Sequence, residues 1–149
     1  MYTVLRITML LTDKQRQFLN QVHFAVVSTI APDGLPHQTV MWYMLDGDEL
    51  LLSTPRGSVK HKHLRRDPRL SVCVEQGYTY ITLTGTVTLD ENPATTRADY
   101  QRLGQRYRNT FNVPSSPPRG GGGRVQDLLS RERVTLRMRI ERVQSNGLD

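Results

Sequence analysis

The feature that most constrains this fold is a succession of short β-rich segments separated by tight turns. Residues 24–30 are apolar and β-branched, which favours a strand. Pro32-Asp33-Gly34 is a strong turn signal, after which the chain returns as a second strand over 36–45. A second turn at Asp46-Gly47-Asp48 leads into a third strand over 49–54. Two hairpins in succession predict an antiparallel meander.

Three further strands are expected in the rest of the chain. They cover residues 70–74, 78–89, where Gly85 indicates a bulge or bend, and 133–140. The last segment alternates strictly, so its apolar residues are expected to face inward and its arginines outward. Its inward residues are Val134, Leu136, Met138 and Ile140.

Helices are expected to be few and short. Thr12 and Gln15 fit a capping box at the start of a helix over 12–22. A second helix is expected over 59–66. A third begins near Asp90-Glu91-Asn92-Pro93, with one face marked by Ala98, Leu103 and Tyr107. Six strands with short helices predict a mainly β protein, a small six-stranded antiparallel barrel with appended helices.

Length and composition indicate a single globular domain over 1–149. The Pro/Gly-rich segment 112–124 reads as a flexible inserted loop, because about 25 residues after it cannot fold alone. No apolar run reaches the ~18 residues of a membrane helix and no secretory signal pattern appears, so a cytoplasmic location is expected. Cys73 is the single cysteine, which excludes an internal disulfide and favours a packed thiol.

The segment from Ser53 to Arg69 carries the strongest chemical signal. Hydroxyls end a strand, a turn containing Gly57 follows, and a helix begins with Lys60 in its first turns. A helix start presents unpaired N–H groups and partial positive charge, so basic residues there favour a bound phosphate. A solvated basic helix is the alternative. The formal net charge of +6 favours anionic partners without choosing among them.

Three stretches resemble the pyridoxamine 5′-phosphate oxidase-like split β-barrel superfamily, and within it the flavin/deazaflavin branch that uses coenzyme F420. The resemblance covers about residues 12–110 and 131–148. The stretches are Pro36-His37 with Trp42-Tyr43, Leu51-Leu52-Ser53-Thr54, and Lys60 with His63-Leu64-Arg65-Arg66-Asp67-Pro68-Arg69. The resemblance implies a homodimer with two cofactor sites at the subunit interface.

The resemblance also implies a set of cofactor-binding residues. Lys60 would grip the phosphate, with His63 nearby where the family often has Asn. Ser58 stands where the family often has Arg, so Arg56 is expected to reach in instead. The full expected set is Val40 and Trp42 against the ring, Ser53 and Thr54 at the ribityl chain or ring edge, Arg56, Lys60 and His63 near the phosphate, and Tyr78 and Tyr80 from the other subunit.

Each aromatic assignment has a structural alternative. Trp42 can simply fill the barrel, and Tyr78 and Tyr80 can be cross-strand aromatics at a dimer seam. His61 lies between basic neighbours and is expected to be exposed, while surface positions are expected for His23 and His37. Without a cysteine cluster or a His-x-x-x-His pair, no metal is expected.

The resemblance implies an oxidoreductase that transfers a hydride between F420 and a small unsaturated or carbonyl substrate, with a tetrapyrrole as one specific candidate. The sequence shows no obvious set of acid–base side chains. This does not argue against an enzyme, because flavins and deazaflavins carry the hydride themselves. F420 is preferred because its acidic tail suits a basic protein, and FMN is the alternative. A non-catalytic cofactor carrier and a nucleic-acid-binding module through phosphate contacts are the rival classes; binding to nucleic acid or membrane is not expected.

Overall fold

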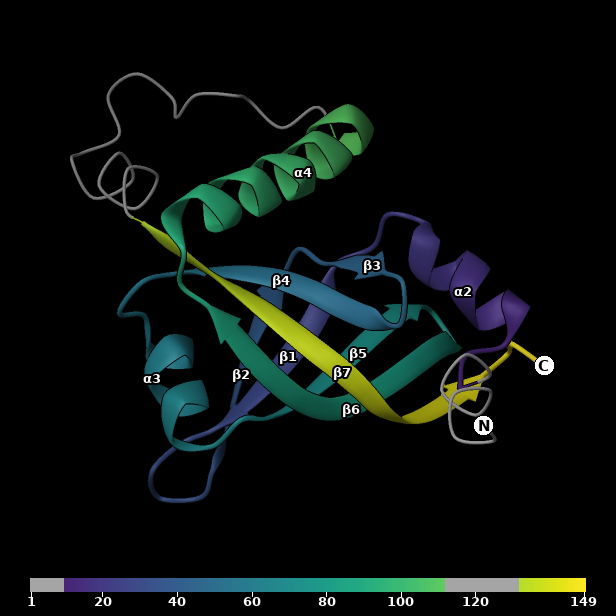
Figure 1. Cartoon of the computed structure of the whole chain (residues 1–149). Coiled ribbons are helices and arrows are strands. Elements are labelled where there is room, and N and C mark those ends of the chain that lie inside the picture. Colours follow the sequence, from purple (N-terminus) through teal and green to yellow (C-terminus); the bar gives the residue numbers. More distant parts are fainter. Residues whose placement is uncertain (1–9, 112–131) are drawn as a thin grey trace, which may run out of the picture.

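The computed structural model describes residues 10–111 and 132–149, and it confirms the split-barrel prediction (Figure 1). All strands belong to one antiparallel sheet with the order β2-β1-β5-β6-β7-β4-β3, which curls around a core. The predicted loop 112–124 lies outside the described residues. The strands are β1 (Ala25–Ile30), β2 (Pro36–Met41), β3 (Met44–Asp46), β4 (Glu49–Pro55), β5 (Arg69–Gln76), β6 (Thr79–Asp90) and β7 (Arg133–Asn146).

The sheet has seven strands in the described part of the chain, so the prediction of six was wrong. The single strand expected over 36–45 is divided into β2 and β3 at Trp42-Tyr43. The backbone N–H of Tyr43 donates to the Tyr107 hydroxyl at 3.0 Å instead of to a strand, and the Tyr43 carbonyl accepts from Arg106 Nε at 3.1 Å. A helix in the second half of the chain therefore takes over the hydrogen bonds that would have continued β2.

The longest strand pairing in the described sheet joins β6 and β7. Its register shifts between Thr84 and Gly85, which confirms the predicted irregularity. A Cβ atom at Gly85 would lie 1.8 Å from the Arg139 carbonyl oxygen, so only glycine permits this backbone approach. β7 continues to Asn146, beyond the predicted end at residue 140, because it follows β6 along its whole length.

In the part of the chain that the structure describes, three helices pack around the barrel: α2 (Asp13–Asn20), α3 (Val59–Arg66) and α4 (Pro93–Phe111). The capping box of α2 is confirmed: Thr12 Oγ1 accepts from the Gln15 N–H and Gln15 Oε1 accepts from the Thr12 N–H. In Figure 1, α4 crosses over β4 and β7, α3 lies beside one end of the barrel, and α2 lies toward the opposite end. Helix α4 thus packs against β4 and β7, and a short turn joins the end of β4 to α3.

The barrel interior is apolar. Val134, Leu136, Met138 and Ile140 are buried, as their alternation predicts. On α4 the buried face contains Leu103 and Tyr107, as expected, but Ala98 is exposed and Asp99 is buried. Asp99 lies inside because Thr135 Oγ1 and Arg137 Nη2 donate to its Oδ2 at 2.9 and 3.0 Å. Helix α4 is thereby fixed onto β7.

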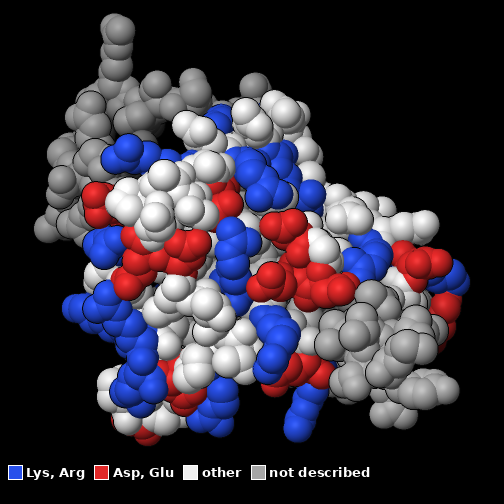
Figure 2. Space-filling model, viewed as in Figure 1, with Lys and Arg blue, Asp and Glu red and all other residues white. Residues whose placement is uncertain are grey.

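Charged side chains of both signs share the face of the molecule in Figure 2. Among the ion pairs of the described residues, Arg102 and Arg137 both pair with Asp46 and Asp99. No helix among the described residues has the length and apolar character needed to cross a membrane.

Candidate functional site

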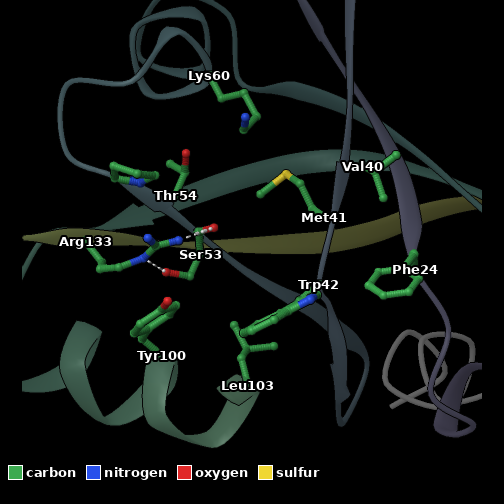
Figure 3. A pocket seen from close by; sticks show the side chains of 11 residues that line it. Phe24, Val40, Met41, Trp42, Ser53, Thr54, Lys60, Tyr100, Leu103 and Arg133 are labelled. Atoms are coloured by element: carbon green, nitrogen blue, oxygen red, sulfur yellow. Dashed lines mark hydrogen bonds between the residues drawn. The ribbon is translucent and has the colours of Figure 1, made fainter. Parts of the chain in front are cut away.

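A pocket of about 350 Å³ opens where α4 crosses the barrel (Figure 3). It is bounded by the end of β2, the end of β4, the beginnings of α3 and β7, and the middle of α4. Its lining residues are Phe24, Val40, Met41, Trp42, Ser53, Thr54, Pro55, Lys60, Tyr100, Leu103 and Arg133. Basic and hydroxyl side chains gather at one end, and apolar side chains at the other.

The polar end is built by the short connection from β4 to α3. Ser58 caps α3, accepting from the His61 N–H at 3.2 Å, and its Oγ lies 2.8 Å from Thr54 Oγ1. This contact ties the end of the strand to the beginning of the helix. Lys60, the second residue of α3, points into the pocket (Figure 3). The Thr54 hydroxyl lies on the same side of the pocket.

Arg133 enters the pocket from the first residue of β7. Its Nε donates to Ser53 Oγ at 2.8 Å, and its Nη2 donates to the Ser53 carbonyl at 3.2 Å. The guanidinium carbon also lies 4.1 Å from the centre of the Tyr100 ring, a cation–π contact. Arg133 is therefore held in one orientation by residues from β4 and α4.

Among the described residues, the two cations at the polar end have no acidic partner. Burial lowers the pKa of Lys60 from its ordinary value, and the nearby charge of Arg133 lowers it further. Burial also lowers the pKa of Arg133. Within residues 10–111 and 132–149, no carboxylate forms an ion pair with either side chain. Two cations that share a partly desolvated space without an acid favour an anionic ligand.

The apolar end is an aromatic wall. Trp42 packs parallel to Tyr107, with 4.9 Å between ring centroids and 9° between planes. Phe24, half exposed, stacks on Phe111 at 5.0 Å, and Val40 is 67% exposed beside the opening. A planar apolar group could lie against this wall while its charged end reaches Lys60.

Five of the nine residues expected to bind a cofactor line this pocket: Val40, Trp42, Ser53, Thr54 and Lys60. Arg56 does not line it, because its side chain pairs with Glu132 at 3.2 Å and Glu91 at 3.8 Å. His63 is buried outside the pocket, where its Nδ1 lies 2.9 Å from Thr29 Oγ1. The structure therefore gives both residues other partners.

Tyr78 and Tyr80 lie on the surface away from the pocket of their own chain. Tyr78 is 92% exposed in the turn between β5 and β6, and Tyr80 is 38% exposed on β6. Both side chains are therefore accessible to another molecule.

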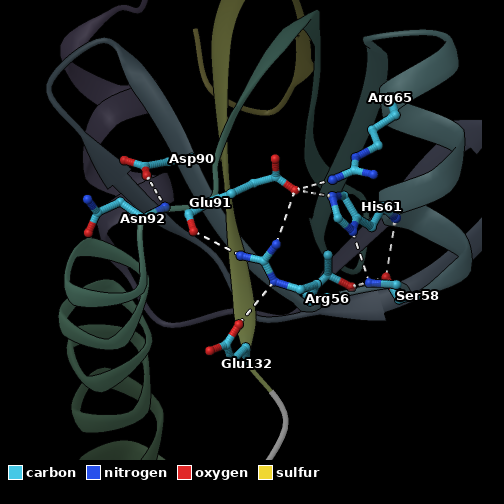
Figure 4. A network of polar contacts seen from close by, with 10 residues as sticks. Arg56, Ser58, His61, Arg65, Asp90, Glu91, Asn92 and Glu132 are labelled. Carbon is cyan, nitrogen blue, oxygen red and sulfur yellow. Dashed lines mark hydrogen bonds and ion pairs between the residues drawn. The ribbon is translucent and has the colours of Figure 1, made fainter.

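His61 is buried, so the expectation that it is exposed was wrong. Its Nδ1 accepts from the Gly57 N–H at 2.9 Å, and its Nε2 lies 2.8 Å from Glu91 Oε1 (Figure 4). Glu91 also accepts from Arg65 at 2.6 Å. His61 is inside because the first turn of α3 faces β6, and both ring nitrogens find partners there. The network links the turn before α3 to the end of β6.

Sequence reasoning missed six lining residues: Phe24, Met41, Pro55, Tyr100, Leu103 and Arg133. Arg133 was expected to face outward with the other arginines of its strand. It is half-buried because α4 covers the outer side of β7 at this point. The spacing of Tyr100 and Leu103 on one helical face was available as a signal for α4. Among the described residues, no three His, Cys, Asp or Glu side chains are placed to hold a metal ion.

The chain belongs to the pyridoxamine 5′-phosphate oxidase family, whose model matches residues 11–147. This confirms the resemblance to the superfamily. No curated protein matches the sequence significantly.

Solved structures share the fold over nearly the whole chain. An F420 reductase superposes with a TM-score of 0.71 at 22% identity, covering 90% of this chain and 98% of that one. A conserved hypothetical protein from Mycobacterium tuberculosis has a TM-score of 0.66 at 27% identity, with 93% and 86% covered. A putative pyridoxamine 5′-phosphate oxidase from Listeria innocua has a TM-score of 0.64 at 19% identity, with 89% and 95% covered.

Proposed function

We propose that this protein is an oxidoreductase that binds a phosphate-bearing deazaflavin, coenzyme F420, and acts on a small unsaturated or carbonyl substrate. The observation that carries the proposal is the pocket itself, in which a cationic and hydroxyl-lined end adjoins an aromatic wall. Membership of the pyridoxamine 5′-phosphate oxidase family supports a flavin-type ligand. The F420 reductase among the similar structures supports the choice of F420.

The residues of the pocket fit such a cofactor. The Lys60 ammonium and the Thr54 hydroxyl offer donors to a phosphate, and the start of α3 adds its partial positive charge. Val40, Met41 and Trp42 offer an apolar surface to a tricyclic ring. The bound cofactor supplies the two-electron chemistry, while the protein supplies binding, orientation and exclusion of water. Ser53 serves indirectly, because its Oγ already holds Arg133.

We include a homodimer in this proposal. Val40 and the aromatic wall leave one side of the pocket open, with Val40 67% and Phe24 45% exposed. A second copy could cover that side and bring Tyr78 and Tyr80 to it. Tyr78, in the turn at one end of the sheet, is almost fully exposed, and Tyr80, on the adjoining end of β6, is partly exposed. A substrate would then enter between the two copies.

FMN is the second candidate cofactor, since it also joins a tricyclic ring to a phosphate and the pocket distinguishes the two weakly. A cofactor with a different tail beyond the phosphate would use the same contacts, and so would a carrier that binds the cofactor without turnover. A nucleic-acid-binding role is less well supported. On the face in Figure 2 side chains of both charges are mixed, and Trp42 and Phe24 of the pocket stack on Tyr107 and Phe111 of α4.

Fluorescence titration of the purified protein tests the proposal. F420 and FMN are added in parallel, and quenching of Trp42, the single tryptophan, reports binding at the wall. We expect micromolar binding of at least one cofactor, tighter for F420, and turnover of F420H2 with an enone or carbonyl acceptor. Binding without turnover would indicate a carrier, and DNA binding with a steep salt dependence in place of cofactor binding would contradict the proposal.

A further inference from the structure

We propose that Arg133 is the second cation of the phosphate site and holds the same phosphate ester as Lys60. This inference rests on the proposed function, because it assumes that a phosphate-bearing ring occupies the pocket. It assigns a binding role to a residue at the beginning of β7, about 70 positions from Lys60 in the sequence.

Hydrogen bonds to Ser53 hold the guanidinium of Arg133 in place and use only some of its N–H donors. Nε and one N–H of Nη2 are used on Ser53, at 2.8 and 3.2 Å. A guanidinium has five N–H donors in one plane, so Nη1 and the remaining N–H of Nη2, which have no partner among the described residues, are available to a ligand. The Tyr100 ring, 4.1 Å from the guanidinium carbon, holds the plane from one side. A preorganised fork of this kind matches the oxygens of a phosphate.

Arg133 and Lys60 border the same space. Both line the pocket, and Thr54 lies between them in the view of Figure 3. The charge of Arg133 contributes to the lowered pKa of Lys60, which places the two cations within mutual electrostatic reach. A doubly ionised phosphate between them would replace this repulsion with two attractions.

The other arginine near the start of α3 is already engaged. Arg56 pairs with Glu91 and Glu132, and its Nη2 donates to the Glu91 carbonyl at 2.9 Å. Arg56 lies outside the pocket and is exposed. Arg133 is half-buried and forms no ion pair with a carboxylate of the described residues, so its charge is the one left for a ligand.

A comparison of FMN with riboflavin isolates the phosphate, because the two flavins differ in that group alone. Titrations use the wild type, Arg133→Ala, and Arg139→Ala as a control, since Arg139 lies on the same strand with its side chain 75% exposed. Arg133→Gln, which removes the charge but keeps a hydrogen-bonding side chain, replaces Arg133→Ala if that variant does not fold. F420 and its phosphate-free deazaflavin core form a second pair if only deazaflavins bind.

We expect Arg133→Ala to weaken FMN about 10- to 100-fold and riboflavin by less than about 3-fold, so that the preference for the phosphate collapses. Arg139→Ala should keep the wild-type preference. A wild-type preference that survives in the Arg133 variant that folds would overturn this inference and leave the proposed function intact. A wild type that binds no member of either pair, or shows no preference for the phosphate, would contradict the proposed function and this inference together.

Discussion

The ring of Trp42 lies parallel to the ring of Tyr107, with their centroids 4.9 Å apart. Tyr107 is fully buried on α4, and its hydroxyl donates to the His23 carbonyl at 2.5 Å and accepts from the Tyr43 N–H at 3.0 Å. One side chain of α4 therefore both interrupts the sheet after β2 and supports the aromatic wall of the pocket. The stability of the barrel and the shape of the site depend on the same residue.

Tyr107→Phe should destabilise the protein by about 1–3 kcal/mol, because the buried Tyr43 N–H loses its acceptor while the ring stays. Chemical denaturation followed by Trp42 fluorescence measures this loss. Cofactor affinity should change little in Tyr107→Phe and fall in Tyr107→Leu, which removes the stacked ring. Equal affinities in the two variants would show that the ring does not shape the wall.

The two hydrogen bonds of the His61 ring lead to a prediction about the turn before α3. His61→Asn keeps an acceptor close to the position of Nδ1 for the Gly57 N–H, whereas His61→Gln reaches only toward Glu91. Because the Gly57 bond fixes the turn that precedes Lys60, we expect weaker cofactor binding in His61→Gln than in His61→Asn. Isothermal titration of both variants checks the order, with Lys62→Ala on the exposed side of α3 as control. The reverse order would assign control of the turn to Glu91.

The burial of His63 leads us to expect that the folded protein is less stable in mild acid. Burial lowers its pKa, and the charges of His37 and Arg66 lower it further, against a smaller opposing effect of Asp33. Below pH 6.5 the unfolded chain binds a proton that the folded protein does not, so the free energy of unfolding decreases with falling pH until the folded-state pKa is passed. His63→Asn, which can still hydrogen-bond Thr29, should remove this part of the pH dependence. Urea denaturation between pH 7.5 and 5 compares the slopes, and identical slopes would refute the assignment.

Gly85→Ala should destabilise the barrel by about 1–3 kcal/mol or more, since the added methyl meets the Arg139 carbonyl and the backbone must move. Thermal denaturation measures the effect, with Thr84→Ala as the neighbouring control. A melting temperature unchanged from the wild type would mean that the register shift at Thr84/Gly85 relaxes without cost.

Local patterns were sufficient for most of the fold. The α3 boundaries and the capping box at Thr12 and Gln15 follow from interactions between near neighbours, while residue type and alternation along the strand indicated the irregularity at Gly85 and the inward face of β7. The break at Trp42-Tyr43 could not be predicted that way. It depends on Tyr107 and Arg106, more than 60 positions away, which take the hydrogen bonds of Tyr43.

The candidate site likewise combines residues that are close in sequence with residues that only the tertiary fold brings together. Ser53, Thr54 and Lys60 are close in sequence, so one strand, one turn and one helix bring them together. Arg133 and Tyr100 reach the pocket only because α4 packs across β4 and β7, and His61 is buried only because β6 ends beside α3. A side chain's exposure in such places depends on distant elements that a single sequence does not position.

Titration of Lys60→Ala against Lys62→Ala, each with F420 and FMN, is the test on which the proposed cofactor site depends. Both variants remove one ammonium from α3, but only Lys60 lines the pocket. We predict that Lys60→Ala weakens the tighter cofactor about 10- to 100-fold and that Lys62→Ala binds as the wild type does. Because the pKa of Lys60 is lowered, wild-type affinity should begin to fall at a pH below 10.5. Unchanged affinity of Lys60→Ala for both cofactors would contradict the proposed phosphate site.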